Sequence, residues 1–159
     1  MKNVVIIGQG PAAYMCGIYI HTANLSPMII KDSMQQAPSF LGFDKVAGVD
    51  GVSTSDEFTN LLEKQARNMS IDIVEDSVIC ISRTNNAFTV ATSNALYESK
   101  ALVIDSICLE KKYRVSLGDT GVFYTSDKAT HNEAIIIAGA GCKVSFDLKE
   151  FIEADAIKQ

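Results

Sequence analysis

The chain has 159 residues, 47% of them hydrophobic and 21% charged, and carries a formal net charge of −5. This length suits one packed domain better than two. The acidic balance disfavours nucleic acid as a direct partner, because phosphates are repelled on average. No apolar stretch approaches the roughly 20 residues of a membrane span, and no secretory leader is evident. We therefore expect a cytoplasmic protein without a membrane partner.

The beginning of the chain has the pattern of one β-α-β unit. Residues 3–7 are a continuous apolar run, typical of a strand that is buried on both faces. Pro11 stands at the first position of a predicted helix, where its missing N–H costs nothing, and the helix continues over residues 12–22. Residues 27–31 predict a second short strand.

A long irregular connection, rich in turn residues, precedes the next helix. Thr54 and Glu57 fit a capping box at the start of that helix. Four apolar residues then fall on one helical face: Phe58, Leu61, Leu62 and Ala66.

The second half of the chain is rich in short β patterns. Residues 71–74, 78–82, 87–92 and 97–105 predict a small antiparallel meander beside the parallel sheet, and residues 121–125 predict one further strand. The basic cluster at residues 110–114 is expected in an exposed loop, with local RNA contact as the alternative. Thr130 and Glu133 fit a second capping box, and the last helix has core spacing at Val144, Leu148, Phe151 and Ile152.

Cysteine and histidine spacing gives no indication of a metal site or of a redox pair. No two of the four cysteines form a C-x-x-C pair, and neither histidine has a metal partner at helical or turn spacing. In a reducing compartment we expect free, mostly buried thiols. The residues concerned are Cys16, Cys80, Cys108 and Cys142, with His21 and His131.

The turn after the first strand matches G-x-G-x-x-A from Gly8 to Ala13. Gly8 permits the tight turn, Gly10 lets a pyrophosphate approach the backbone, and Ala13 lets helix and strand pack closely. The N–H groups at the start of the helix are exposed, and together with the helix dipole they favour an anion. The strand before and the strand after supply the context that this motif requires, so the turn predicts nucleotide binding.

The end of the second strand departs from the usual pattern. An acid is expected there to hold ribose hydroxyls, but the position holds Lys31. Asp32 is adjacent and, by strand alternation, is expected to point to the opposite side. Lys31 is therefore a candidate for attracting a phosphate, or else is solvated.

Longer segments resemble a known family. The stretch VVIIGQGPAAYMCGIYI, residues 4–20, resembles the FAD-domain opening of the low-molecular-weight thioredoxin reductases. The segments ANLSPMII, SFLGF and SIDIVEDSVICIS are similar to later parts of that domain. The C-terminal GVFYTSD and NEAIIIAGAGC are similar to its second FAD-binding segment. The resemblance covers most of residues 1–105 and 119–155.

The resemblance implies one FAD-domain-like unit over residues 1–159, with halves at 1–105 and 119–155. A linker at 106–118 stands where the family carries its NADPH domain and redox C-x-x-C pair. The implied cofactor contacts lie at the glycine turn, at the strand that meets the adenine, in the diphosphate loop and at the start of the last helix. Together with Lys31, the candidate cofactor-binding residues are Gly8, Gly10, Pro11, Ala12, Ala13, Val78, Asp127 and Ala134.

Several flavin-facing segments of the family are absent or altered here. Nothing corresponds to its G-G-Q-L-T segment, its A-T-G strand end reads VIDSIC, and the glycine before Asp127 is replaced by Ser126. Glu133 would bring a negative charge near the flavin, and it suits the second capping box better. With no nicotinamide site and no dithiol, the reductase cycle has no path.

These patterns lead to one main expectation and two alternatives. The chain is expected to be a non-catalytic, thioredoxin-reductase-like protein that binds within a larger assembly, such as a ribosome or other ribonucleoprotein particle, with or without a bound adenine nucleotide. A homodimer is a further candidate. The first alternative is a minimal FAD flavoprotein that a partner protein reduces. The second is a sensor of adenine nucleotides at residues 8–13.

Overall fold

Strand β1 (Lys2–Gly8) is a central parallel strand of the sheet, as its apolar run predicts. The computed structural model describes residues 2–85 and 87–157. In it, β1 is flanked in parallel by β2 (Pro27–Asp32) and by β6 (Leu96–Asp105). Val4, Val5, Ile6 and Ile7 are all 0% exposed, because helices or strands cover both faces of the sheet at this point.

The strands follow the order β3-β2-β1-β6-β5-β4, and β7 lies beside the last part of β6. β3, β2, β1, β6 and β7 run parallel, whereas β6, β5 and β4 form an antiparallel meander. The predicted fold, a Rossmann-like parallel sheet with a small antiparallel meander, is confirmed. The expectation that residues 71–74 belong to the meander is wrong, because β3 pairs in parallel with β2. The remaining strands are Asp72–Asp76 (β3), Val78–Thr84 (β4), Ala87–Thr92 (β5) and Val122–Tyr124 (β7).

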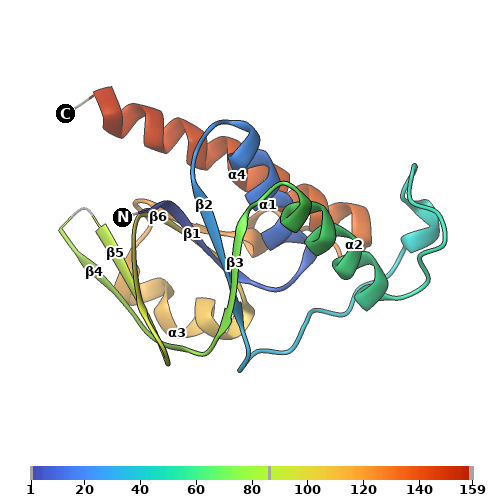
Figure 1. Cartoon of the computed structure of the whole chain (residues 1–159), viewed down its shortest axis with the longest axis horizontal. Coiled ribbons are helices and arrows are strands. Elements are labelled where there is room, and N and C mark those ends of the chain that lie inside the picture. Colours follow the sequence, from blue (N-terminus) through green and yellow to red (C-terminus); the bar gives the residue numbers. More distant parts are fainter. Residues whose placement is uncertain (1, 86, 158–159) are drawn as a thin grey trace.

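Helices cover both faces of this sheet (Figure 1). Side chains at alternate positions of β1 point to opposite faces, so Val4 and Ile6 pack with one group of helices and Val5 and Ile7 with another element. The first group is α1 (Pro11–Thr22), α2 (Ser55–Asn68) and α4 (Ala134–Ile157); the opposite face carries α3 (Ile107–Leu117).

The expected loop around residues 110–114 is wrong, because these residues belong to α3. Ser106 caps the helix: its Oγ accepts a hydrogen bond from the Leu109 backbone N–H at 3.3 Å. Leu109, Tyr113 and Leu117 recur at a spacing of four and are buried against the sheet. The segment 106–118 is expected to be a linker. It instead contains the helix α3, which follows β6 and precedes β7 in the chain and packs on the sheet.

The Thr54 cap of the first predicted capping box forms, whereas the Thr130 cap of the second does not. Thr54 Oγ1 accepts from the Glu57 backbone N–H at 3.2 Å, as predicted for the start of α2. By contrast, α4 begins at Ala134, whose backbone N–H donates to the Leu41 carbonyl at 2.6 Å. Glu133 instead pairs with a lysine of the long connection, Lys45, at 3.4 Å. The expectation for Leu61 is also wrong, since 44% of this residue is exposed.

Helices α1 and α4 are in close contact because of a glycine. A Cβ atom added at Gly141 would lie 2.0 Å from the carbonyl oxygen of Ala12, which no side chain tolerates. The contact holds the 24-residue helix α4 over the N-terminal turn of α1. Within the described residues, no helix combines the length and the apolar character that crossing a membrane requires.

Candidate ligand-binding crevice

A cavity of about 960 Å³ opens at the carboxyl ends of β1, β2 and β6. β1 lies between β2, the next strand in the chain, and β6, which comes much later. Open α/β sheets bind their ligands in the crevice at such a switch point. The walls come from the glycine turn, the segment after β2, the start of α3 and the loop before α4, and they include Gly8, Gln9, Ala12, Asp32, Pro38, Asp105, Ser106, Ile107, Thr125 and His131.

The glycine turn forms one wall of this crevice. Gly8 and Ala12 line it directly. Gly10 lacks a side chain and so allows other groups to approach its backbone closely, but these groups are Pro38 and Asp105 of the same chain. A Cβ atom at this position would lie 2.6 Å from Pro38 Cγ and 3.0 Å from Asp105 Oδ2.

Asp105, at the end of β6, lies against the amides that open α1. Its Oδ2 accepts a hydrogen bond from the Ala13 backbone N–H at 3.2 Å, and its Oδ1 accepts from Thr125 Oγ1 at 2.5 Å. Enclosure of this carboxyl by protein raises its pKa, and hydrogen bonds from Thr125, Ala13 and Gly10 act in the opposite direction. A side-chain carboxylate therefore takes the position at the helix N-terminus that favours an anion.

Asp32, at the end of β2, also lines the crevice, so the expectation that it points away is wrong. The residue is 1% exposed. Its Oδ1 accepts from the backbone N–H groups of Met34 at 3.1 Å and Val78 at 3.2 Å. Its Oδ2 has no hydrogen-bond partner among the described residues. Sequence reasoning missed this residue, although an acid at the end of the second strand was the feature being sought.

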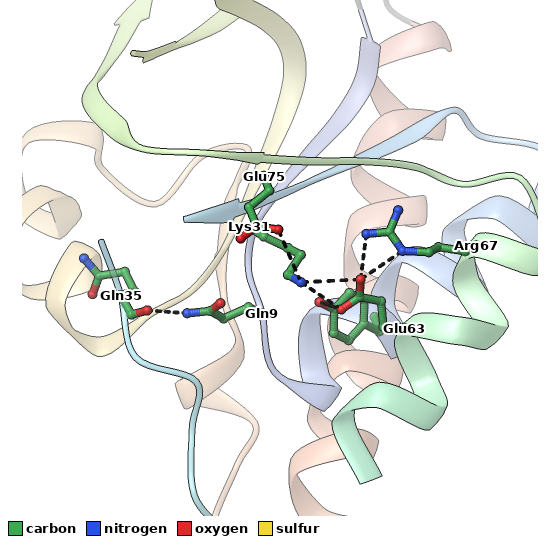
Figure 2. Close-up of polar contacts among 7 residues, drawn as sticks. Gln9, Lys31, Gln35, Glu63, Arg67 and Glu75 are labelled. Carbon is green, nitrogen blue, oxygen red and sulfur yellow. Dashed lines mark hydrogen bonds and ion pairs between the residues drawn. The ribbon is translucent and has the colours of Figure 1, made fainter. Parts of the chain in front are cut away.

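Lys31 turns away from the crevice and joins a charged cluster between the sheet and α2 (Figure 2). Its Nζ lies 3.1 Å from Glu63 and 3.9 Å from Glu75, and Arg67 lies 2.6 Å from Glu63. Tyr14 Oη donates to the same Glu63 carboxylate at 2.8 Å. Burial raises the pKa of Glu63, but the hydrogen bonds from Arg67, Tyr14 and Lys31 outweigh it, and the net pKa is lowered.

The segment after β2 is tied to the glycine turn. Gln9 Nε2 donates to the backbone carbonyl of Gln35, a contact drawn in Figure 2. Ser106 Oγ donates to the Gln35 side-chain oxygen at 3.3 Å. These bonds hold the wall formed by residues 34–39 against the turn and against the start of α3.

The other candidate cofactor residues lie outside the crevice walls. Asp127 is paired with Arg114 of α3 at 2.5 Å and lines a smaller cavity of about 390 Å³. Val78 contributes its backbone N–H to Asp32. Ala134 is buried at the start of α4. Pro11 and Ala13 belong to the turn but not to the set of wall residues.

The crevice is acidic. Asp32, Asp105 and Glu110 lie in its walls. Glu110 forms an ion pair with Arg114, which is not a wall residue. Among the described residues, no lysine or arginine lines it, and His131 is its sole basic side chain. A site that holds a diphosphate normally supplies positive charge or free amides, so this wall chemistry disfavours phosphate.

The cysteines are free thiols on different elements: Cys16 is buried, Cys142 is partly exposed, and Cys80 and Cys108 are exposed. Burial raises the pKa of the Cys16 thiol far above its usual value, which leaves it unreactive. The prediction of mostly buried thiols is therefore correct for Cys16 and wrong for Cys80 and Cys108. In the described part of the chain, no group of three or more His, Cys, Asp or Glu side chains could hold a metal ion.

The fold is of the Rossmann-like type found in dinucleotide-binding proteins. No protein-family model matches the chain. It is 31% identical over 106 residues to the thioredoxin reductase of Rickettsia bellii, covering 64% of this chain and 34% of that protein. It is 26% identical over 132 residues to the thioredoxin reductase of Borreliella burgdorferi, and this match covers 78% of this chain and 38% of that protein.

Solved structures show the same relationship at the level of the fold. A thioredoxin reductase from Streptococcus pyogenes matches with a TM-score of 0.57 at 24% identity, over 67% of this chain and 35% of that one. A thioredoxin reductase from Giardia duodenalis matches with a TM-score of 0.57 at 19% identity, over 66% of this chain and 35% of that one. The chain is similar to the thioredoxin reductases over about two thirds of its own length, and it spans about a third of the length of the relatives that it matches.

Proposed function

We propose that the chain is a thioredoxin-reductase-like protein without reductase activity of its own, which holds a small ligand in its crevice as a binding component of a larger assembly in the cytoplasm. The observation that carries this proposal is the position of Asp105. A carboxylate on the amides of the glycine turn competes with the flavin diphosphate that a reductase needs there.

The route for electrons supports the same proposal. The resemblance places a nicotinamide domain and its redox thiols between β6 and β7. This chain has α3 at that point, and α3 packs directly on the sheet. Its free cysteines are distributed over α1, β4, α3 and α4. No C-x-x-C pair is present among them.

The proposal of a larger assembly draws support from exposed apolar side chains near α3. Val115 is 97% exposed, Ile107 66%, and Ile79 on the neighbouring strand β4 59%. Exposed apolar surface often marks a partner contact. Phe40 does not add to this exposed surface, because it is 2% exposed and packs against Phe43 and Phe58. A ribosome, another ribonucleoprotein particle and a homodimer remain the candidate partners.

A turnover assay tests the missing reductase activity. The purified chain is mixed with NADPH, added FAD and oxidised thioredoxin, and NADPH oxidation is followed against a complete thioredoxin reductase as positive control. We expect no oxidation above the rate without protein. Sustained, protein-dependent turnover would refute the proposal.

A minimal flavoprotein reduced by a partner is a second candidate, favoured by the volume and position of the crevice. At about 960 Å³ it is large enough for a sizeable cofactor. This function requires bound FAD, so protein purified from its native source should be yellow and release flavin on denaturation. Colourless protein would eliminate this candidate.

A sensor of adenine nucleotides is the third candidate, favoured by the unpaired oxygen of Asp32 beside the glycine turn. A nucleotide that binds the folded state raises the melting temperature by mass action. Replacing Gly10 by a bulky residue should abolish that rise. If the rise survives this replacement, the glycine turn is not the site.

A further inference from the structure

Asp105 takes the position that a ligand phosphate would need. Gly8 and Asp105 are direct partners in the β1–β6 ladder. A Cβ atom at Gly8 would lie 2.6 Å from Asp105 Cβ, so the missing side chain of Gly8 leaves the room that Asp105 occupies. From there the carboxylate reaches the backbone N–H of Ala13. The missing side chain of Gly8 thus lets a carboxyl group of the chain itself approach the amides that open α1.

Asp32 is unsatisfied and therefore points to a ligand with hydrogen-bond donors. Few buried carboxylate oxygens lack a partner, because leaving one unsatisfied is costly. Asp32 is 1% exposed and lines the crevice, and its Oδ2 is unpaired and almost closed to solvent in the described structure. A carboxylate accepts hydrogen bonds, so the group that satisfies it is a donor such as a sugar hydroxyl.

The rim of the same crevice offers apolar surface. Met34 and Ile107 both line the crevice, although 74% and 66% of these residues are exposed. They belong to different walls, the segment after β2 and the start of α3. Exposed apolar side chains on the walls of a cavity suit a flat, apolar ring such as a nucleobase.

From these features we propose that the crevice binds a nucleoside, a base with an uncharged sugar, and rejects nucleotides and dinucleotides. Asp32 accepts from the sugar hydroxyls, and Asp105 excludes phosphate from the glycine turn. The proposal rests on the ligand-binding part of the proposed function and specifies its ligand class. It reverses the preference expected of a G-x-G-x-x-A turn.

Calorimetric titration of the whole chain tests this proposal. The probes are adenosine, guanosine, cytidine and uridine, each compared with its 5′-monophosphate and 5′-diphosphate, and FAD. We expect at least one nucleoside to bind at least tenfold more tightly than its own phosphates and than FAD. Phosphates or FAD that bind as tightly as every nucleoside, or no binding of any nucleoside, would overturn the proposal.

Three variants assign the effect to residues. Asp105→Gly removes the internal carboxylate and should raise the affinity for the diphosphate at least tenfold. Asp32→Asn should lower the nucleoside affinity at least tenfold. Glu75→Gln removes the same charge on β3, outside the crevice walls, and should change neither affinity. A diphosphate affinity that is unchanged in a folded Asp105→Gly variant would contradict the assignment.

If a variant fails to fold, the affinities of the wild-type chain for nucleosides, for their phosphates and for FAD still test the proposed ligand class. The NADPH assay separates the two proposals. Turnover in that assay overturns the lack of reductase activity, whereas loss of the nucleoside preference overturns the ligand class.

Discussion

The Oδ2 atom of Asp105 lies 3.2 Å from the backbone nitrogen of Ala13, which joins the end of β6 to the start of α1. The two residues are 92 positions apart in the chain. This bond places a carboxyl group of the chain itself beside the glycine turn. It connects the stability of the fold to the chemistry of the crevice, so the same side chain is open to thermodynamic and to binding tests.

The raised pKa of Asp105 predicts a specific pH dependence of stability. Because the folded state holds the proton more tightly than the unfolded chain, this group's contribution is greatest below the unfolded pKa of about 3.9 and is lost as pH rises to the folded value. Asp105→Asn removes the titration. The free energy of unfolding of wild type minus that of the variant should therefore fall as pH rises above about 3.9. Urea unfolding at a series of pH values measures it, and a constant or rising difference would contradict the assignment.

Gly141 should tolerate no side chain. The Cβ atom of Gly141→Ala would meet the Ala12 carbonyl at 2.0 Å, and backbone of both helices must shift to relieve the clash. Overpacking of this kind costs about 1–3 kcal/mol. Gly139 in the same helix is the matched control, because an added Cβ has no neighbour within 4 Å. Gly139→Ala should stabilise by about 0.5–1 kcal/mol through helix propensity. Equal effects in thermal or urea unfolding would contradict the packing described here.

Glu63 should contribute measurably to stability. Glu63→Gln leaves the largely buried Lys31 ammonium and the Tyr14 hydroxyl without their charged partner. We expect a loss of about 1–3 kcal/mol. Glu75→Gln is the control, since Glu75 lies 3.9 Å from Lys31 and its side chain is 68% exposed; it should cost less than about 0.5 kcal/mol.

The pH dependence of Glu63 has the opposite sign to that of Asp105. Its lowered pKa means that the stabilisation is complete above the unfolded pKa of about 4.3 and is lost as pH falls through the folded value. The difference between wild type and Glu63→Gln should therefore shrink in acid. A difference that persists at low pH would show that charge is not the cause.

The two candidate capping boxes should differ in mutagenesis. Thr54→Ala removes the acceptor for the Glu57 N–H at the start of α2 and should cost about 1 kcal/mol. Thr130→Ala should change stability by less than about 0.5 kcal/mol, because its described side-chain partner is His131, an exposed neighbour. A larger effect at Thr130 than at Thr54 would restore the capping box that the sequence suggests for α4.

The sequence predicts those parts of the fold whose signals are local. The apolar run of β1, the glycine turn and Pro11 determine the first β-α-β unit almost to the residue. α3 also has a local signal, the spacing of Leu109, Tyr113 and Leu117, but the charged residues between them gave the segment the character of a loop. At α4 a nonlocal bond replaces the predicted local cap, since the Leu41 carbonyl accepts from the Ala134 N–H.

The crevice was harder to predict because its decisive contacts are nonlocal. Asp105 reaches the turn through the pairing of β6 with β1, which no short motif encodes. Asp32 ends its strand, and its bonds to Met34 and Val78 determine where its carboxylate lies. Strand alternation separated Lys31 from Asp32 correctly but assigned the wrong one to the crevice.

Titration of FAD into the wild-type chain and into Asp105→Gly, followed by flavin fluorescence, tests the central claim most directly. The claim is that the chain's own carboxylate occupies the phosphate position of the glycine turn. It predicts no saturable change with the wild type and saturable binding with the variant. Stoichiometric FAD binding by the wild type would contradict it.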